Sequence, residues 1–286
     1  MSLTAGRALI VGGTSGIGAG MAQALAARHY QVVVAGRSAE RGRQVIASLD
    51  ATTGGQHKFV AVDCFDLSSV RAAVEEVGEP VDVLVLCQGM ATLQGYTPTE
   101  KDGLDEKLQL HYFSRIYASL LVCPHMQPGG RVLTVLSAGV HSKYKHCETD
   151  FELKDRYSIK NAADAAGFYT DAGFEALSQK FPNVTFCHAA PGFVATAWGT
   201  EMPAVLRTLV IRPLQKMFGK SARDCGETLT RGLLDLPPPS GDNDAQGGFY
   251  LMDEKGKIID KAKGIKHTDA ERDLIWEKTL ALLPDV

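Results

Sequence analysis

The chain has 286 residues, of which 45% are hydrophobic and 22% are charged, and its formal net charge at pH 7 is −3. These values are typical of a soluble globular protein, and one α/β domain is the default organisation at this length. The charge balance provides no basic surface for nucleic acid, so a nucleic-acid partner is not expected.

Cysteine spacing and the apolar runs bear on metal binding and on location. Six cysteines occur without a CxxC pair, which indicates reduced, buried thiols and no metal site. A strand-like segment begins within a few residues of Met1, and no apolar run approaches the roughly 18 residues that span a bilayer. We therefore expect no signal peptide, no transmembrane segment and a cytoplasmic protein.

Short apolar, β-branched runs alternate with amphipathic segments of helical length along the chain. Strands covered on both faces have such continuous apolar runs, because neither face meets water. The pattern predicts an α/β fold with a doubly wound parallel sheet, in a single domain over residues 1–286. The predicted strands are residues 8–11, 32–36, 58–63, 81–86, 131–137 and 184–190.

A glycine-rich turn, GGTSGIGAG at residues 12–20, follows the first predicted strand directly and leads into a helical pattern. Glycine lets the backbone approach a pyrophosphate closely, and the helix N-terminus adds N–H donors and a favourable dipole. The order strand, turn, helix therefore predicts a dinucleotide site, whereas a glycine cluster alone could be an ordinary strand–helix turn.

This turn resembles the Thr-Gly-x-x-x-Gly-x-Gly motif of the short-chain dehydrogenase/reductase family, with Val11 in place of the threonine. The family's Pro-Gly-x-x-x-Thr segment, which faces the nicotinamide, is matched by Pro191, Gly192 and Thr196. The resemblance covers nearly the whole chain, and DFEL at residues 150–153 places it nearest the retinol-dehydrogenase-like branch. It implies a Rossmann-type fold and hydride transfer between nicotinamide and a carbonyl or alcohol.

The end of the second predicted strand indicates which dinucleotide is bound. NAD-specific relatives have an acidic residue there, whereas this chain has Gly36 and Arg37. A guanidinium can hold a 2′-phosphate, so NADP(H) is the expected cofactor. Ser15 and Arg41 are candidate helpers, although Arg41 could equally belong to a solvated helix face.

Two further positions resemble cofactor contacts of the family. Asp66 matches an adenine-contacting aspartate, and it could also be the N-cap of the following helix. The fourth strand ends Leu-Cys-Gln-Gly where relatives have Asn-Asn-Ala-Gly, so only Gly89 is retained from that motif. The expected cofactor-binding residues are Gly12, Ser15, Gly16, Ile17, Gly18, Arg37, Asp66, Gly89, Pro191, Gly192 and Thr196.

Reduction of a carbonyl requires a proton donor for the developing alkoxide and a second donor that orients the carbonyl. The resemblance assigns Ser137, at the end of the fifth strand, as the orienting group and Tyr157 as the proton donor. A strand-terminal serine that satisfies its own backbone is the alternative for Ser137. In the family a lysine lowers the pKa of the tyrosine, and an asparagine supports that lysine through water.

Lys160 follows Tyr157 by three residues instead of the family's four, and Asn161 occupies the usual position. On a helix this turns the lysine by roughly 100° around the axis. Its flexible side chain could still reach the nicotinamide ribose if Tyr157 precedes the helix. If Tyr157 and Lys160 do not act as a pair, the alternative is that the protein binds NADP(H) without catalysis and has a redox-linked regulatory or partner-binding role. His111 replaces the asparagine and could hold a water, serve as an alternative acid, or be a core histidine.

Residues 197–224 form the expected substrate lid, an apolar stretch broken by two prolines and carrying basic residues. Its composition favours a lipophilic small-molecule carbonyl or alcohol, with a peripheral membrane contact as the alternative. The chain closes with a helical pattern at about 268–283, where Thr268 and Glu271 have the spacing of a capping box. Dimers are common in the resembled family, so the resemblance makes a homodimer one possible state, and the sequence does not determine the oligomeric state.

Overall fold

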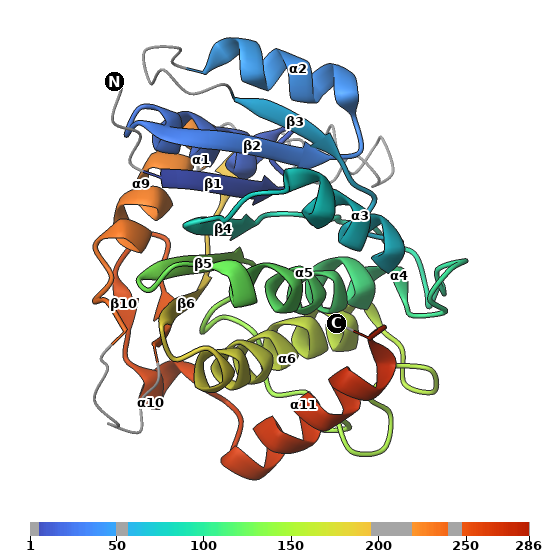
Figure 1. The fold of residues 1–286 in the computed structure, drawn as a ribbon. Coiled ribbons are helices and arrows are strands. Elements are labelled where there is room, and N and C mark those ends of the chain that lie inside the picture. The colour runs from blue at the N-terminus through green and yellow to red at the C-terminus, as the bar shows by residue number, and fades with distance from the viewer. Residues whose placement is uncertain (1–5, 50–56, 196–218, 240–247, 286) are drawn as a thin grey trace.

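The computed structural model describes residues 6–49, 57–195, 219–239 and 248–285. These residues form an eight-stranded sheet in the order β10-β9-β6-β5-β4-β1-β2-β3, with helices on both faces (Figure 1). All neighbouring strands are parallel except the edge pair of β9 and β10. The predicted doubly wound α/β fold is therefore confirmed.

All six predicted strands are present in this sheet. Its strands are β1 (Gly6–Val11), β2 (Tyr30–Gly36), β3 (Lys58–Ala61), β4 (Val83–Leu86), β5 (Gly130–Val135), β6 (Val184–Ala189), β9 (Phe249–Met252) and β10 (Ile258–Ile259). A separate parallel pair consists of β7 (Val194–Ala195) and β8 (Lys220–Ser221).

The helices fall into two layers, one against each face of the sheet. The helical elements are α1 (Gly16–Ala26), α2 (Ala39–Ser48), α3 (Leu67–Val77), α4 (Glu106–Leu108), the π-helix η2 (Gln109–Phe113), α5 (Ser114–Val122), the 3-10 helix η3 (Cys123–His125), α6 (Ile159–Lys180), α9 (Ala222–Leu234), α10 (Lys261–Gly264) and α11 (Asp269–Leu282). The layer of α1, α2 and α9 covers one face, and the layer of α3, α5, α6 and α11 covers the other.

Strand residues alternate between two hydrophobic cores, which explains the uninterrupted apolar runs in the sequence. In β1, Ala8 and Ile10 belong to one core, whereas Leu9 and Val11 belong to the other. Successive side chains of a strand point to opposite faces, so a sheet with helices on both faces needs apolar residues at every position.

Strand β1 lies between β4 and β2, so the direction of the strand order reverses beside β1. Open α/β sheets bind ligands at such a reversal, outside the carboxyl ends of the strands. The parallel arrangement brings the segments that follow β1, β2, β4, β5 and β6 to this one edge. Most of the predicted site residues belong to these segments.

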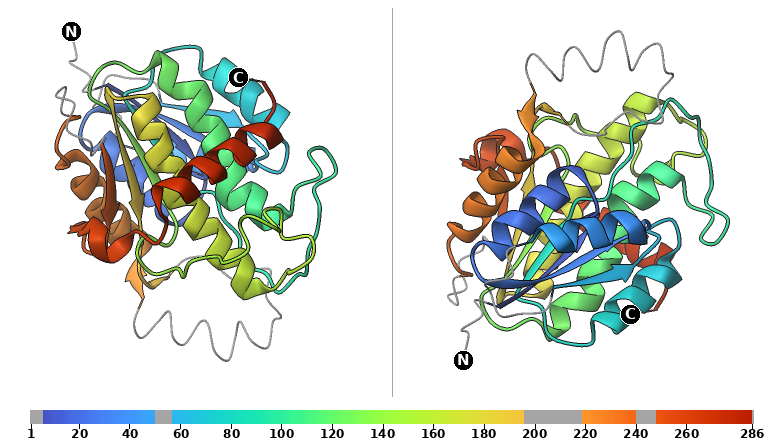
Figure 2. Two further views of the ribbon diagram at one scale, coloured as in Figure 1. Left: turned by 90° about the horizontal axis from the view of Figure 1, so that it is seen from below. Right: turned by 90° about the horizontal axis from the view of Figure 1, so that it is seen from above.

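The C-terminal helix α11 lies across α6, as Figure 2 shows. Its N-terminus has the complete capping box of Thr268 and Glu271. Ile275 is fully buried, and the Thr279 hydroxyl lies 2.6 Å from the hydroxyl of Tyr112 in η2. The helix is thus part of the layer that supports the carboxyl edge. In the described part of the chain, no helix is long and apolar enough to cross a membrane.

Two glycines allow α1 and α9 to pack closely. A Cβ on Gly20 would lie 2.2 Å from the carbonyl oxygen of Ala222, and one on Gly226 would lie 2.3 Å from the carbonyl carbon of Gly20. Both obstacles are backbone atoms, which cannot move aside as a side chain can. The contact between these helices, which carries α1 and its glycine turn, requires glycine at both positions.

We expect Gly20→Ala to lower the free energy of unfolding by about 1–3 kcal/mol, although alanine is the better helix former, because the added methyl overpacks the α1–α9 contact. Urea denaturation measures the change. Gly95→Ala is the control, since a Cβ there meets no heavy atom within 4 Å, and it should change stability by less than about 0.5 kcal/mol. Equal effects of the two substitutions would contradict the close-packing argument.

Candidate active site

A cavity of about 350 Å³ lies at the carboxyl edge of the sheet. Its wall combines the glycine turn, the ends of β2, β4 and β5, the π-helix η2 and Pro191. No acidic residue is among the described residues that line it. Eight of the residues predicted to bind a cofactor line this one cavity: Gly12, Ser15, Gly16, Ile17, Gly18, Arg37, Gly89 and Pro191.

The glycine turn fits the backbone of a neighbouring strand end. Gly12 has a φ of +79°, and a Cβ there would lie 2.5 Å from the backbone nitrogen of Gln88. A Cβ on Gly18 would lie 2.3 Å from the carbonyl oxygen of Gly12. Ser15 is the N-cap of α1 but makes no side-chain cap, so its hydroxyl does not occupy the first-turn N–H groups. This turn has the form that binds a pyrophosphate.

Two exposed arginines flank the part of the cavity next to β2. The guanidinium of Arg37 lies over the ring of Phe65, 5.2 Å from its centroid. Arg41 lines the same wall from α2. Gly36 lies in contact with Thr14 of the glycine turn, where a Cβ would be 2.8 Å from Cγ2 of Thr14. This wall therefore presents positive charge, and a larger residue at position 36 would push against the turn.

Three predicted cofactor contacts are not in the cavity wall. Asp66 is the N-cap of α3 and accepts hydrogen bonds from the backbone N–H of Ser68 at 2.9 Å and from its hydroxyl at 2.6 Å. Gly192, next to Pro191, has a φ of +70° and contacts Glu254. Thr196 lies outside the described residues, as does most of the predicted lid, of which residues 219–224 are described.

Arg115 of α5 is a site residue that sequence reasoning missed. Its guanidinium is fully buried and donates to the Thr134 hydroxyl at 2.6 Å, to the Val135 carbonyl at 2.9 Å and to the Gln88 carbonyl. It therefore joins the ends of β4 and β5, where the asparagines of the family motif are absent. Burial lowers its pKa to about 10. An arginine within the otherwise apolar segment SRIYASLLV was the available signal.

His111 lies in the π-helix η2 and lines the cavity. Its Nε2 accepts a hydrogen bond from the backbone N–H of Met90 at 3.1 Å, and a Cβ on Gly89 would lie 3.3 Å from the same atom. Burial, followed by the charges of Arg115 and Lys107, lowers its pKa to about 3. The ring is therefore neutral at physiological pH, which speaks against a role as an acid.

Tyr157 precedes α6, whose N-cap is Ser158. Its hydroxyl donates to the carbonyl of Gln94 at 3.1 Å, and the ammonium of Lys107 lies over its ring, 5.2 Å from the centroid. Burial, with a smaller effect of Asp105, raises its pKa to about 12. The cation next to Tyr157 is thus Lys107 of α4.

Lys160 lies at the protein surface and not beside Tyr157. Its side chain is 75% exposed and forms an ion pair with Asp164 one turn later in α6. Asn161, in the family's lysine position, donates from its side chain to the carbonyl of Arg156 at 2.7 Å. The structure therefore does not bring Tyr157 and Lys160 together, because the helix begins only after Tyr157 and its first turn faces solvent at Lys160.

Ser137 follows β5 at the carboxyl edge, as predicted. Its backbone N–H donates to Nε2 of His188 at 2.9 Å, and its carbonyl lies 2.9 Å from Nδ1 of His141. The hydroxyl is buried and has no hydrogen-bond partner among the described residues. The alternative in which this hydroxyl satisfies its own backbone is therefore not formed. Ser137 is not among the described residues that line the cavity, although its neighbours Val135 and Leu136 are.

The pKa of His111 predicts a difference in acid stability. A histidine whose folded pKa lies below its unfolded value of about 6.5 contributes stability above that value and loses it as the pH falls. Between about pH 7.5 and about pH 4.5, we expect the wild type to lose about 2–3 kcal/mol more unfolding free energy than His111→Asn. Urea denaturation at both pH values tests this. His125→Asn is the control, because His125 is exposed, and it should lose as much unfolding free energy as the wild type does. Equal losses in the wild type and both variants would contradict the lowered pKa of His111.

The sequence is similar to known dehydrogenases and oxidoreductases. The model of the short chain dehydrogenase family matches residues 7–204. The chain is 33% identical over 260 residues to polyprenol dehydrogenase of Mus musculus, which covers 86% of this chain and 75% of that protein. An oxidoreductase of Emericella nidulans is 27% identical over 312 residues, covering 96% and 92% of the two chains.

Solved structures share the fold. A short chain dehydrogenase from Burkholderia cenocepacia, in complex with NADP, has a TM-score of 0.63 and 22% identity over 90% of this chain and 99% of that one. An uncharacterised protein from Mycobacterium paratuberculosis has a TM-score of 0.70 and 21% identity over 98% and 94% of the two chains.

Proposed function

Because the chain belongs to the short-chain dehydrogenase/reductase family, we propose that it is an NADP(H)-dependent oxidoreductase acting on a carbonyl or alcohol. The observation that carries this proposal is the cavity that joins the glycine turn and Arg37 to Pro191 along one sheet edge. Its lining includes the glycine turn, so the pyrophosphate of a dinucleotide would lie at the N-terminus of α1. Bound NADPH would supply the hydride.

The choice of NADP(H) rests on the charge of the wall next to β2. Arg37 and Arg41 would hold the 2′-phosphate. The hydroxyl of Ser15, which forms no capping hydrogen bond with α1, would be an additional donor. The wall has no carboxylate among its described residues to repel a phosphate or to bind the ribose hydroxyls instead. Solved relatives in complex with NADP or NADPH support this choice.

In the proposed reaction Ser137 orients the carbonyl through its unpaired hydroxyl. Tyr157 is the candidate proton donor, and a nearby cation would have to lower its pKa, which burial raises to about 12, for efficient proton transfer. Its hydroxyl would have to leave the Gln94 carbonyl to reach the substrate. Lys160 would likewise have to leave Asp164 to hold the ribose, so Lys107 is the better-placed cation.

A lipophilic substrate is supported by apolar side chains exposed around the carboxyl edge. Those side chains are Leu93 after β4, Val140 after β5, Ile159 at the start of α6 and Phe193 after β6. The relative named polyprenol dehydrogenase points in the same direction, since a polyprenol is a long apolar alcohol. Most of the predicted lid, residues 197–224, lies outside the described residues.

A second function, NADP(H) binding without catalysis, is favoured by the separation of Tyr157 from Lys160. In that case the protein would act as a redox-linked regulator or partner-binding protein. Both functions require the same cofactor cavity, so they differ only in turnover.

We expect turnover of NADPH with at least one member of a panel of lipophilic aldehydes, ketones and quinones, and a kcat about 100-fold lower for Tyr157→Phe. Lys107→Met should also lower kcat, whereas Lys160→Met should remain within about twofold of the wild type because its ammonium is at the surface. Wild-type protein that binds NADPH tightly but converts no substrate would contradict the enzymatic function. A large decrease in kcat for Lys160→Met would instead support the Tyr157–Lys160 pair expected from the resemblance.

We expect Arg37→Asp to weaken NADPH binding about 100-fold and NADH binding by much less, because a carboxylate would replace a cation next to the 2′-phosphate. Fluorescence titration of each cofactor measures the two affinities. Arg43→Asp is the matched control, since Arg43 is exposed on α2 and does not line the cavity. Equal weakening of both cofactors by Arg37→Asp would contradict the assignment of the 2′-phosphate site.

A further inference from the structure

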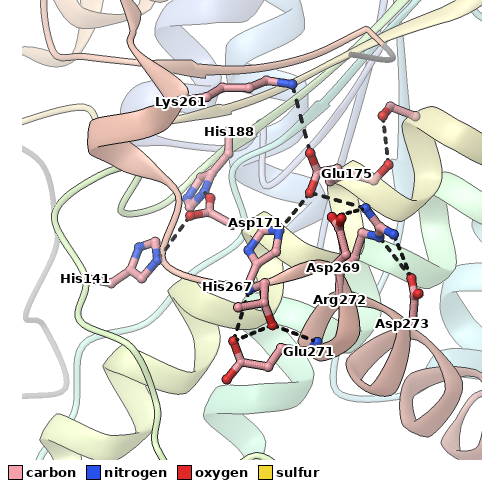
Figure 3. Close-up of polar contacts among 12 residues, drawn as sticks. His141, Asp171, Glu175, His188, Lys261, His267, Asp269, Glu271, Arg272 and Asp273 are labelled. Carbon is pink, nitrogen blue, oxygen red and sulfur yellow. Dashed lines mark hydrogen bonds and ion pairs between the residues drawn. The ribbon is translucent and has the colours of Figure 1, made fainter. Parts of the chain in front are cut away.

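A buried carboxylate lies between two histidines (Figure 3). Both histidines contact the backbone of Ser137. Asp171 of α6 contacts Nδ1 of His188 in β6 at 2.6 Å and Nε2 of His141, in the loop after β5, at 3.2 Å. The side chains of Asp171 and His188 are fully buried, and that of His141 is 1% exposed. A buried carboxylate is stable only if neighbouring groups donate hydrogen bonds to it or carry a positive charge, so the protonation states of the two histidines matter.

The hydrogen bonds of His188 fix its protonation state. Its Nε2 accepts the backbone N–H of Ser137, so this nitrogen carries no proton. Its Nδ1 must then hold the proton of the neutral ring and donate it to Asp171. Burial, with a contribution from the charges of His141 and Arg115, lowers the pKa of His188 despite Asp171, which agrees with a neutral ring.

The contacts of His141 favour a protonated ring, whose positive charge would balance Asp171. Its Nδ1 donates to the carbonyl of Ser137, and a lone pair on Nε2 would face the carboxylate of Asp171. Burial alone would lower its pKa, but Asp171, the Ser137 carbonyl and Asp164 outweigh burial and raise it. Burial alone would raise the pKa of Asp171, but the two histidines outweigh it and keep it below the usual range.

The cluster holds Ser137 at both of its backbone polar groups, the N–H through His188 and the carbonyl through His141. Neither histidine has a nitrogen left for the Ser137 hydroxyl, so this is not a nucleophilic Ser-His-Asp triad. Gly167 of α6 makes room for the arrangement, because a Cβ there would lie 2.5 Å from Ser137 Oγ and from Cγ of His141.

We propose that His141, Asp171 and His188 are positioning residues that hold the Ser137 hydroxyl for the substrate carbonyl, and that they do so only while His141 is protonated. This inference rests on the proposed oxidoreductase function. Loss of the His141 proton would set a lone pair against Asp171 in the dry interior and displace the ring that holds the Ser137 carbonyl.

The charged and titratable groups that face this cluster in the described part of the chain come from three elements. They are Asp171 and Asp164 on α6, His188 on β6, and Arg115 on α5, which acts on His188. Asp164 also accepts from the backbone of Ser142 and pairs with Lys160. His141 is thus the group of the cluster whose pKa is raised and whose charge would change with pH.

Asp171→Asn and His141→Gln test the inference against Glu175→Gln. Glu175 lies one turn further along α6 and accepts from His267 at 2.8 Å (Figure 3). Glu175→Gln therefore removes a similar carboxylate–histidine pair whose histidine is not one of the two that contact Ser137. We expect Asp171→Asn to lower kcat about 10- to 100-fold and to leave NADPH affinity within about twofold. Glu175→Gln should leave both within about twofold of the wild type.

The pH profile separates positioning from a merely structural role. Because the active form has a protonated His141, wild-type kcat should fall as the pH rises through the pKa of His141. His141→Gln keeps a donor for the Ser137 carbonyl but cannot titrate, so this alkaline decline should be absent in that variant. Nitrogen NMR of histidine-labelled protein should show both nitrogens of His141 protonated at about pH 6 and only Nδ1 of His188 protonated.

Wild-type kcat in Asp171→Asn, an unchanged alkaline decline in His141→Gln, or a neutral His141 at about pH 6 would each overturn the inference. If Asp171→Asn does not fold, as judged by circular dichroism, the profile of His141→Gln decides. Failure of the proposed function has a different signature, namely tight NADPH binding without turnover by the wild type, and it would overturn the catalytic role of the cluster as well.

Discussion

The buried guanidinium of Arg115 holds together the sheet edge on which the site is built. A buried charge raises the free energy of the folded state unless hydrogen bonds replace its lost hydration. Arg115 donates to neutral acceptors in β5 and to the Gln88 carbonyl just after β4. These strand ends form the cavity wall between Gln88 and Val135, and the Gly12 turn packs directly on Gln88. The position of the glycine turn thus depends on the hydrogen bond from Arg115 to the Gln88 carbonyl.

The same charge influences the protonation of the histidines around the site. After burial, Arg115 contributes to lowering the pKa of both His111 and His188. Each of these rings accepts a backbone N–H through Nε2, as only an unprotonated nitrogen can. His141 also faces Asp171, but its other nitrogen meets the Ser137 carbonyl and not a backbone N–H, so Ser137 lies between two rings with opposite hydrogen-bonding roles.

The loop before α6 explains why the tyrosine and lysine of the family pattern do not meet. Asp150 accepts the backbone N–H groups of Asp155 and Arg156, which fixes the chain as it approaches the helix. Ser158 then caps α6, so the helix starts at Ile159, two residues after Tyr157. Spacing in the sequence translates into an angle only within a helix, and Tyr157 is outside it.

The sequence by itself determined the fold, the glycine turn and the positive wall next to β2, because each of these depends on local features. Strand periodicity, glycine spacing and Arg37 at a strand end are visible in short segments, and parallel strands bring their carboxyl ends together in a predictable way. The tertiary structure alone decided which charges meet in the interior. Arg115 and Gln88, or Asp171 and His141, are separated along the chain by whole elements, and nothing local marks them as partners. Burial and neighbouring charge set the pKa of His111 and Tyr157, and both arise only when distant elements pack against each other.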